Sequence, residues 1–143
     1  MLKKMFGLSA IFSLACGCIM PPAAASQASY VETARTGDDT WHMSLDRIEI
    51  NGDFVRTWFK IDPYIDKDQP RIKTMRTWEM FDCVNKTSAT LQWFSYDAKG
   101  RVVLSNEIPA EEIAMKPVIP ESVSDANLQG ACLVRSMRQK SKE

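Results

Sequence analysis

Residues 48–61 read IEINGDFVRTWFKI, and this stretch decides the fold class. Two runs rich in β-branched and aromatic residues flank Asn51-Gly52. This dipeptide is typical of a two-residue type I′ hairpin turn, in which both central residues need positive φ. The stretch therefore predicts an antiparallel hairpin that turns at Asn51-Gly52.

Strand signals continue on both sides of this hairpin. Before it, Trp41, Met43 and Leu45 alternate with polar residues. After it, a loop at 62–70 is bracketed by prolines, and three more strand-like runs follow with short turns between them. These runs are RTWEMFDCV (76–84), TLQWFSYD (90–97) and RVVLS (101–105). Because short connections favour antiparallel neighbours, we expect the strands to form a meander.

The last part of the chain predicts a helix. Prolines at 109, 117 and 120 exclude a continuous helix over 106–120. Ser122 can then cap a helix through SVSDANLQGACLV (122–134), and the basic residues beyond it suit a helix C-terminus. We expect an α+β fold, an antiparallel β-sheet meander with a C-terminal helix packed on one face.

The first 25 residues carry the features of a secretory signal peptide. Lys3 and Lys4 precede a short apolar run, and Ala23-Ala24-Ala25 offers a cleavage site for signal peptidase. We expect an exported protein of the periplasm or the outer cell surface. Its expected organisation is a signal peptide at 1–25, a flexible leader at 26–39, a domain at 40–136 and a basic tail at 137–143.

Residues 15–26, ACGCIMPPAAAS, leave a second processing route open. A small residue precedes both Cys16 and Cys18, as lipid attachment to a cysteine requires. The residues three before each cysteine, however, are not the branched aliphatic ones usual at such a site. We favour simple cleavage after Ala25, with lipidation of Cys16 or Cys18 as the alternative. Such a lipid is the one expected link to a membrane.

Two cysteines remain beyond the signal peptide, Cys83 and Cys132. In an oxidising compartment such a pair most simply forms one disulfide. Closing a loop of this length contributes about 4 kcal/mol in the loop-entropy model. Two free buried thiols are the alternative. Because Cys83 ends a predicted strand and Cys132 lies in the predicted helix, a bridge would pin the helix to the sheet.

The composition gives no case for nucleic acid, metal, cofactor or catalysis. Basic and acidic residues balance at 18 each, so no excess of positive charge indicates nucleic-acid binding. His42 is the single histidine, and with two cysteines it falls short of the four ligands of structural zinc. His42, Ser44 and Asp46 would share one strand face, whereas a catalytic set converges in a cleft. We expect no enzyme, no cofactor and no metal site.

Several motifs make the chain resemble a known family. They are Asn51-Gly52-Asp53 leading into Val55-Arg56-Thr57-Trp58, the strand end Phe81-Asp82-Cys83, the stretch 96–103 (YDAKGRVV), and 117–123 (PVIPESV) followed by Cys132. In order and spacing they resemble the surface-adhesin protein E group of bacterial exported proteins. The resemblance implies a sheet with a disulfide-tethered C-terminal helix. It also implies a cell-surface role in binding host extracellular-matrix and serum proteins.

Alternation along the strands predicts a partner surface. If the helix covers the face that holds Cys83, then Trp78 and Met80 point to the opposite face. Trp58 joins them from the preceding strand, whose core-facing set would be Val55, Thr57, Phe59 and Ile61. Large apolar side chains on an uncovered face usually mark a binding or self-association surface.

Two features qualify this prediction. In the alternative arrangement, the segment 106–120 folds back over this face and buries Trp58, Trp78 and Met80, which then form no exposed partner surface. The same alternation places Glu79 on the helix-covered face, where a carboxylate is tolerable only near the rim.

Two functions of different classes follow from these features. The first is an exported bacterial cell-envelope binding protein of the adhesin type, with a protein as its ligand. The alternative is a structural or accessory periplasmic protein that binds another bacterial component or itself, for example as a homodimer.

Overall fold

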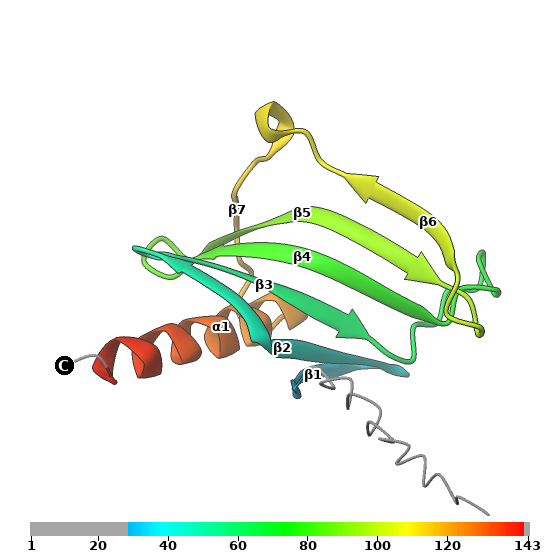
Figure 1. Ribbon diagram of the computed structural model, residues 1–143, viewed down its shortest axis with the longest axis horizontal. Coiled ribbons are helices and arrows are strands. Elements are labelled where there is room, and N and C mark those ends of the chain that lie inside the picture. The colour runs from blue at the N-terminus through cyan, green and yellow to red at the C-terminus, as the bar shows by residue number, and fades with distance from the viewer. Residues whose placement is uncertain (1–28, 142–143) are drawn as a thin grey trace, which may run out of the picture.

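The computed structural model describes residues 29–141, so the predicted signal peptide and the candidate lipidation sites Cys16 and Cys18 lie outside the described residues. The elements are β1 (Tyr30–Thr36), β2 (Asp39–Asn51), β3 (Phe54–Ile61), β4 (Thr74–Asp82), β5 (Thr87–Tyr96), β6 (Val102–Glu107), a 3-10 turn η1 (Ala110–Glu112), β7 (Lys116–Pro117) and α1 (Val123–Lys140). The first six strands form an antiparallel meander in chain order, and β7 pairs with β5. Helix α1 packs on one face, which confirms the predicted fold (Figure 1).

The hairpin lies where the sequence predicts it, but its turn is shifted by one residue. Asn51 pairs with Phe54, so Gly52 and Asp53 are the two central residues. Gly52 has a φ of 59°, and Asp53 is not among the residues with positive φ. Positive φ at the first central position alone is typical of a type II′ turn, which favours glycine at that position. The expected type I′ turn at Asn51-Gly52 is therefore wrong.

The expected flexible leader at 26–39 is also wrong for most of its length. Residues 30–36 form β1, which pairs with β2, and Gly37-Asp38 makes the turn between them. The hydrogen-bond ladder with β2 orders this polar segment, although its side chains show no clear alternation. At the other end, α1 continues to Lys140, so the expected boundary between domain and tail at 136/137 falls inside the helix.

The core lies between α1 and the face of the sheet that the alternation predicted. Val55, Thr57, Phe59 and Ile61 are all fully buried. Val55 and Phe59 pack with Met43 and Phe81 from the neighbouring strands and with Leu128 and Ala131 from α1. The rings of Phe59 and Phe81 meet edge to face, 5.8 Å between centroids. Burial of these apolar side chains is what holds helix and sheet together.

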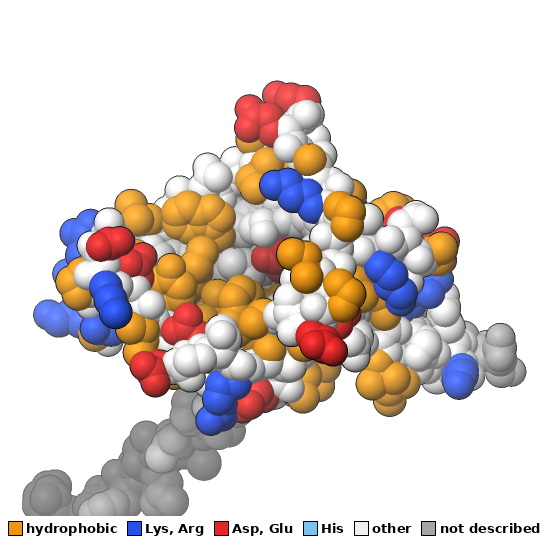
Figure 2. All heavy atoms as spheres, turned by 180° about the vertical axis from the view of Figure 1, so that it is seen from behind, with side chains coloured by type: hydrophobic (Ala, Val, Ile, Leu, Met, Phe, Trp, Pro, Cys, Tyr) orange, Lys and Arg blue, Asp and Glu red, His pale blue; other side chains and the backbone are white. Residues whose placement is uncertain are grey.

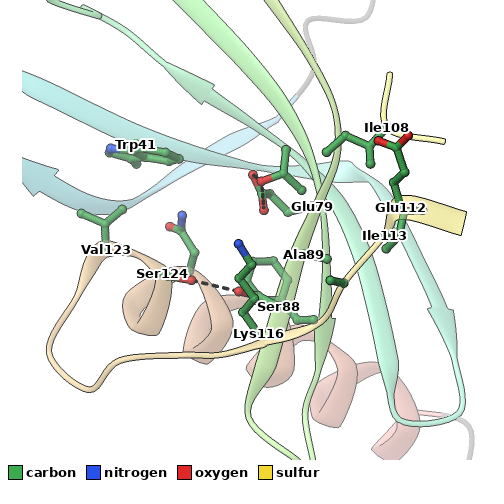
Figure 3. A pocket seen from close by; sticks show the side chains of 14 residues that line it. Trp41, Glu79, Ser88, Ala89, Ile108, Glu112, Ile113, Lys116, Val123 and Ser124 are labelled. Carbon is green, nitrogen blue, oxygen red and sulfur yellow. Dashed lines mark hydrogen bonds between the residues drawn. The ribbon is translucent and has the colours of Figure 1, made fainter. Parts of the chain in front are cut away.

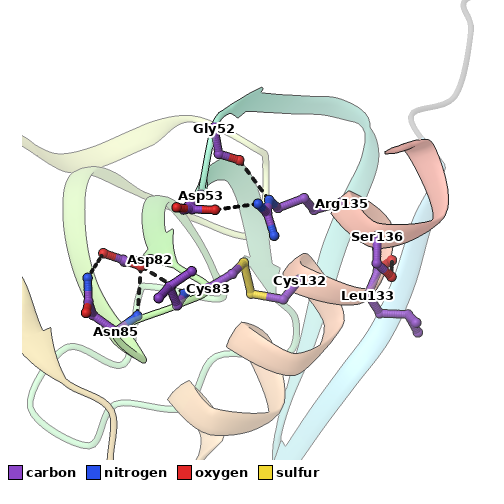
Figure 4. Close-up of a disulfide and its surroundings, with 10 residues drawn as sticks. Gly52, Asp53, Asp82, Cys83, Asn85, Cys132, Leu133, Arg135 and Ser136 are labelled. Atoms are coloured by element: carbon purple, nitrogen blue, oxygen red, sulfur yellow. Dashed lines mark hydrogen bonds and ion pairs between the residues drawn. A yellow bond between two sulfur atoms is a disulfide. The ribbon is translucent and has the colours of Figure 1, made fainter. Parts of the chain in front are cut away.

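A disulfide and two arginine side chains are among the contacts that hold α1 on the sheet, and Figure 4 shows the disulfide and Arg135. Cys83 and Cys132 form the predicted disulfide. Arg135 donates hydrogen bonds to the Gly52 carbonyl and to the Asp53 carboxylate, so the helix also holds the tip of the β2–β3 hairpin. The second arginine is Arg138, which donates to the Leu45 carbonyl.

The turn after β4 holds Cys83 in position. The Asp82 carboxylate accepts hydrogen bonds from the backbone N–H groups of Val84 and Asn85 and from the Asn85 side chain (Figure 4). The bonds from Asn85, followed by that from Val84, keep the pKa of Asp82 below its usual range, because they favour the ionised carboxylate.

Candidate functional site

The sheet face opposite α1 carries a cluster of aromatic side chains. We call this the open face. Trp58 and Trp78 lie directly opposite each other on β3 and β4, with ring centroids 5.3 Å apart, and Phe94 of β5 lies 6.0 Å from Trp58. All three side chains are half-buried. Aromatic pairs at such distances attract each other beyond the effect of burial, so the cluster is a preformed apolar surface.

Cationic side chains surround this aromatic cluster. Arg76 stacks over the ring of Tyr96 at 5.4 Å, and Lys60 lies over the ring of Tyr30 at 5.5 Å. Arg56 of β3 is a third cation on this face. Stacking on an aromatic face holds a cation in place while leaving it accessible to a second partner. The open face thus combines an apolar centre with a basic surround.

A shallow hollow beside the cluster is also lined by cations. Lys60, Lys73 and Arg76 face it, together with Asp62 and Asp97. Both carboxylates are already engaged, Asp62 by Lys60 at 3.1 Å and Asp97 by Arg101 at 2.7 Å. Hydrogen bonds from Arg101 keep the pKa of Asp97 below its usual range. Lys73 and Arg76 make no ion pair among residues 29–141, so the hollow offers positive charge.

Each residue of the predicted partner surface can now be located. Trp58 and Trp78 lie side by side, and Met80 follows Trp78 on the same face, opposite Arg56. The segment after β6 reaches this face at one corner, where Ile108, Pro109, Ala110 and Ile113 line a groove with Trp78 and Met80. Trp58 lies outside that groove. Phe94, Tyr96 and Tyr30 also belong to the open face, and sequence reasoning did not assign them to it.

The helix-covered side of the sheet contains a cleft of about 600 Å³. Figure 2 looks onto this side and shows the hollow between the sheet, the start of α1 and the segment before β7. The cleft is lined by Trp41 of β2, Glu79 and Phe81 of β4, Ser88, Ala89 and Thr90 of β5, residues 108 and 112–114, Lys116 of β7, and Val123, Ser124 and Asn127 of α1 (Figure 3). Its volume is in the range of small-molecule sites.

Glu79 lies within this cleft, on the face where the alternation placed it. Its two carboxylate oxygens accept from the Thr90 hydroxyl at 3.1 and 3.2 Å. Burial raises the pKa of Glu79, and the hydroxyls of Thr77 and Thr90 oppose that rise only in part. The Thr77 hydroxyl is close enough to affect this pKa, but it makes no hydrogen bond of normal geometry among the described residues. Thr90 is therefore the one side chain of residues 29–141 that donates a hydrogen bond to Glu79.

His42, Ser44 and Asp46 do not form a catalytic set. His42 pairs with Lys60 on the open face, and burial, followed by the charge of Lys60, lowers its pKa. Ser44 is buried with no partner for its hydroxyl within residues 29–141. The Asp46 carboxylate accepts from the Ser29 N–H, and Asp46 lies in an irregular stretch of β2, where the strand parity breaks.

Two features are absent from the described residues. These residues contain no group of three or more His, Cys, Asp and Glu residues placed to hold a metal ion. Nor does any helix within 29–141 have the length and apolar character needed to cross a membrane.

Comparison with known proteins identifies a family and a fold. The family model of surface-adhesin protein E matches residues 29–133, a range that includes β1. Among solved structures, Haemophilus influenzae protein E is similar with a TM-score of 0.52 and 14% identity, over 80% of this chain and 91% of that chain. A second crystal form of that protein gives a TM-score of 0.53, 14% identity, and coverage of 80% and 94%. At such identities the likeness concerns the fold alone. No curated protein matches the chain by sequence.

Proposed function

The chain belongs to the surface-adhesin protein E family, and from this premise we propose that it is an exported bacterial adhesin of the cell envelope. Its open face binds a protein partner, of which host extracellular-matrix and serum proteins are the candidates. The observation that carries this proposal is the cluster of Trp58, Trp78 and Phe94 on the open face.

The aromatic cluster has the composition of a binding hot spot. In protein–protein interfaces, the few residues that contribute most of the binding energy are enriched in tryptophan and arginine. Trp58 and Trp78 are rigidly placed by their own contact at 5.3 Å, so little side-chain freedom is lost on binding. Outside the corner contacted by the segment after β6, no described element covers them.

The charges around the cluster indicate an acidic partner. Arg76 and Lys73 make no ion pair among residues 29–141, while the acidic groups beside them are paired with Lys60 and Arg101. A partner segment that brings carboxylates to this rim and apolar side chains to the centre would be complementary in both respects. Acidic, partly apolar segments of matrix or serum proteins meet this description.

Self-association is the second candidate, because an uncovered apolar sheet face also suits a homodimer. Stacking two open faces would bury the tryptophans, but it would also bring together Lys73 and Arg76 of both copies, which make no ion pair among residues 29–141. Like charges at an interface disfavour that pairing. We therefore place the binding of a different, acidic protein first.

Binding to a panel of immobilised matrix and serum proteins tests the proposal. Purified wild-type protein is compared with Trp58→Ser and Arg76→Glu, and with Lys140→Glu, a matched charge reversal at the exposed end of α1. We expect saturable binding that falls at least about tenfold in both open-face variants and less than about twofold in the control. If no member of the panel is bound, or if all four proteins bind alike, the proposed function fails.

Sedimentation separates the two candidates. The proposed function predicts a monomer in the wild type and in Trp78→Ser, whereas self-association predicts a dimer that Trp78→Ser dissociates. Labelling of intact cells with a reagent that does not cross the outer membrane then tests surface location. A domain that is labelled only after the outer membrane is opened cannot act as a host adhesin.

A further inference from the structure

The cleft on the helix-covered side holds opposite charges that the proposed function does not use. Glu79 lies in it from the sheet side, and Lys116 extends into it from β7 (Figure 3). No ion pair joins the two, and among the described residues Lys116 makes no ion pair at all. A negative and a positive group therefore share one concave site without neutralising each other.

The carboxylate of Glu79 is only partly satisfied by hydrogen bonds. It accepts from one hydroxyl, that of Thr90, although an ionised carboxylate has about four lone-pair sites. The neighbouring Thr77 is almost fully buried, and its hydroxyl lacks a hydrogen bond of normal geometry within 29–141. An acid kept in such surroundings has spare capacity to accept from a donor that enters the cleft.

Asn127 adds a fixed donor to the same site. Only 3% of this residue is exposed. Its side-chain oxygen accepts from the Thr33 hydroxyl at 2.6 Å, which fixes the amide, and its nitrogen makes no hydrogen bond among the described residues. Because Asn127 lines the cleft, this amide N–H group is a second donor beside the ammonium of Lys116.

Much of the remaining lining is apolar. Trp41, Phe81, Ile108, Ile113 and Val123 come from four separate parts of the chain and line the same cleft. A ligand that only paired with the charges would leave this surface in contact with water. The site therefore suits a small molecule that carries an apolar group along with two opposite charges.

We infer that this cleft binds a small zwitterion, namely a free α-amino acid with an apolar or aromatic side chain. Glu79 accepts from its ammonium group, Lys116 and Asn127 donate to its carboxylate, and the side chain packs against the apolar lining. A peptide segment inside a protein carries neither charge on its backbone, so the ligand is a free amino acid and not a loop of a partner. The cleft lies on the other side of the sheet from Trp58 and Trp78, although Ile108 and Ile113 also line the groove at the corner of the open face, and the inference does not depend on the proposed function.

Three commercially available probes test each charge in turn by calorimetry. L-Phenylalanine has both charges, N-acetyl-L-phenylalanine lacks the cation, and L-phenylalaninamide lacks the anion. We expect L-phenylalanine to bind, with either analogue at least about tenfold weaker. The indole N–H signal of Trp41, followed by NMR, should shift in the same titration, while those of Trp58 and Trp78 on the open face stay in place.

Variants assign each charge to its partner. Glu79→Gln should weaken L-phenylalanine at least about tenfold and leave N-acetyl-L-phenylalanine within about twofold. Lys116→Ala should weaken L-phenylalanine to a similar extent and leave L-phenylalaninamide unchanged. Glu111→Gln, which removes an exposed acid of the same 3-10 turn that does not line the cleft, is the matched control and should bind as the wild type does.

Several results would overturn the inference. One is a folded wild-type protein that binds no L-phenylalanine at millimolar concentration. Another is equal binding of all three probes, which would make the cleft a general apolar site. A shift of the Trp58 and Trp78 signals in place of that of Trp41 would move the ligand to the open face. None of these results bears on protein binding by the open face, so the two proposals fail separately.

Discussion

At the scale of single residues, Glu79 is the side chain whose position is hardest to explain by stability alone. It stands on the core-facing side of β4, two residues from buried Phe81, and its carboxylate has one hydroxyl donor. Burial raises its pKa, so the neutral form is favoured relative to an unfolded chain. A residue that the fold tolerates at a cost is a candidate for a role in binding.

Glu79→Gln should therefore change how stability depends on pH. Because the folded pKa of Glu79 is raised, the stabilisation of its neutral form is fully present below the unfolded pKa and is lost as the pH rises through the folded pKa. The amide variant does not titrate. We expect the free energy of unfolding of the wild type to fall, relative to Glu79→Gln, between acidic and mildly basic pH.

Urea unfolding of both proteins across this pH range measures the difference. Glu112→Gln, at an exposed position of the same cleft, is the control and should follow the wild type within about 0.5 kcal/mol. A wild type that gains stability over Glu79→Gln as the pH rises would show that the carboxylate is stabilised in the folded state, contrary to our account.

Two glycines show how far single residues were predictable. The Asn51-Gly52 signal located the hairpin, but the residue pair that occupies the turn is Gly52-Asp53. The register is set by the long ladder between β2 and β3 and not by the dipeptide itself. Gly37 has a φ of 54° in the β1–β2 turn, and the Gly37-Asp38 pair was a usable hairpin signal that the polar surroundings obscured.

At the scale of elements, α1 depends on its first turn and on its disulfide. The Ser122 hydroxyl accepts from the Asp125 N–H at 3.2 Å, and the Asp125 carboxylate accepts from the Glu121 N–H at 3.0 Å. These bonds satisfy backbone donors that have no partner within the helix. The sequence predicted the cap at Ser122, two residues after Pro120.

Ser122→Ala should lower the free energy of unfolding by about 1 kcal/mol, because the Asp125 N–H loses its acceptor. Ser136→Ala is the matched control, since its hydroxyl bonds to a carbonyl of its own helix, that of Leu133. This change inside the helix should be neutral or slightly stabilising, because alanine has the higher helix propensity. Chemical unfolding compares the two, and equal losses would argue against a capping role for Ser122.

Replacing both Cys83 and Cys132 with serine should cost about 4 kcal/mol, given the 49-residue separation of the two cysteines. The bridge joins the end of β4 to the third turn of α1, so its loss also frees the helix from the sheet. The midpoint of urea unfolding reports the loss. Reductant should destabilise the wild type by a similar amount and leave the double variant unchanged; any other pattern contradicts the pairing.

Strand parity was the most successful inference from sequence at this scale. It placed Val55, Phe59 and Phe81 in the core and Trp58 and Trp78 on the other face, as observed. It could not assign β5. That strand carries an extra residue, Leu91, opposite the step from Trp78 to Glu79, so alternation read from one end gives the wrong face at the other.

At the scale of the whole molecule, the two faces of the sheet have different chemistry. The open face presents aromatic side chains with basic side chains next to them. The covered face carries the core and the cleft. The grouping of Trp58, Trp78 and Met80 on one face could be predicted because they lie on two adjacent strands. The cleft could not, since its lining comes from β2, β4, β5, β7 and α1, which only the folded chain brings together.

Salt should distinguish the two sites. Protein binding by the open face relies on Arg76 and Lys73 at exposed positions, where added salt screens the charges. We expect the association rate with an acidic partner to fall several-fold between about 0.05 and 0.5 M NaCl. The binding of L-phenylalanine in the cleft, where Glu79 and Asn127 are largely shielded from solvent, should change less. Association rates from surface plasmon resonance and affinities from calorimetry give the comparison, and salt-independent protein binding would contradict the role of the basic surround.

The four tryptophans make the central claim directly measurable. Trp58 and Trp78 lie on the open face, whereas Trp41 packs against the core and Trp93 pairs with buried Thr77 on the covered face. NMR of the four indole N–H signals, recorded while a bound matrix or serum protein is added, reports which face is contacted. We predict that the Trp58 and Trp78 signals shift or broaden before those of Trp41 and Trp93. Perturbation confined to Trp41 and Trp93 would contradict the assignment of the open face as the adhesive surface.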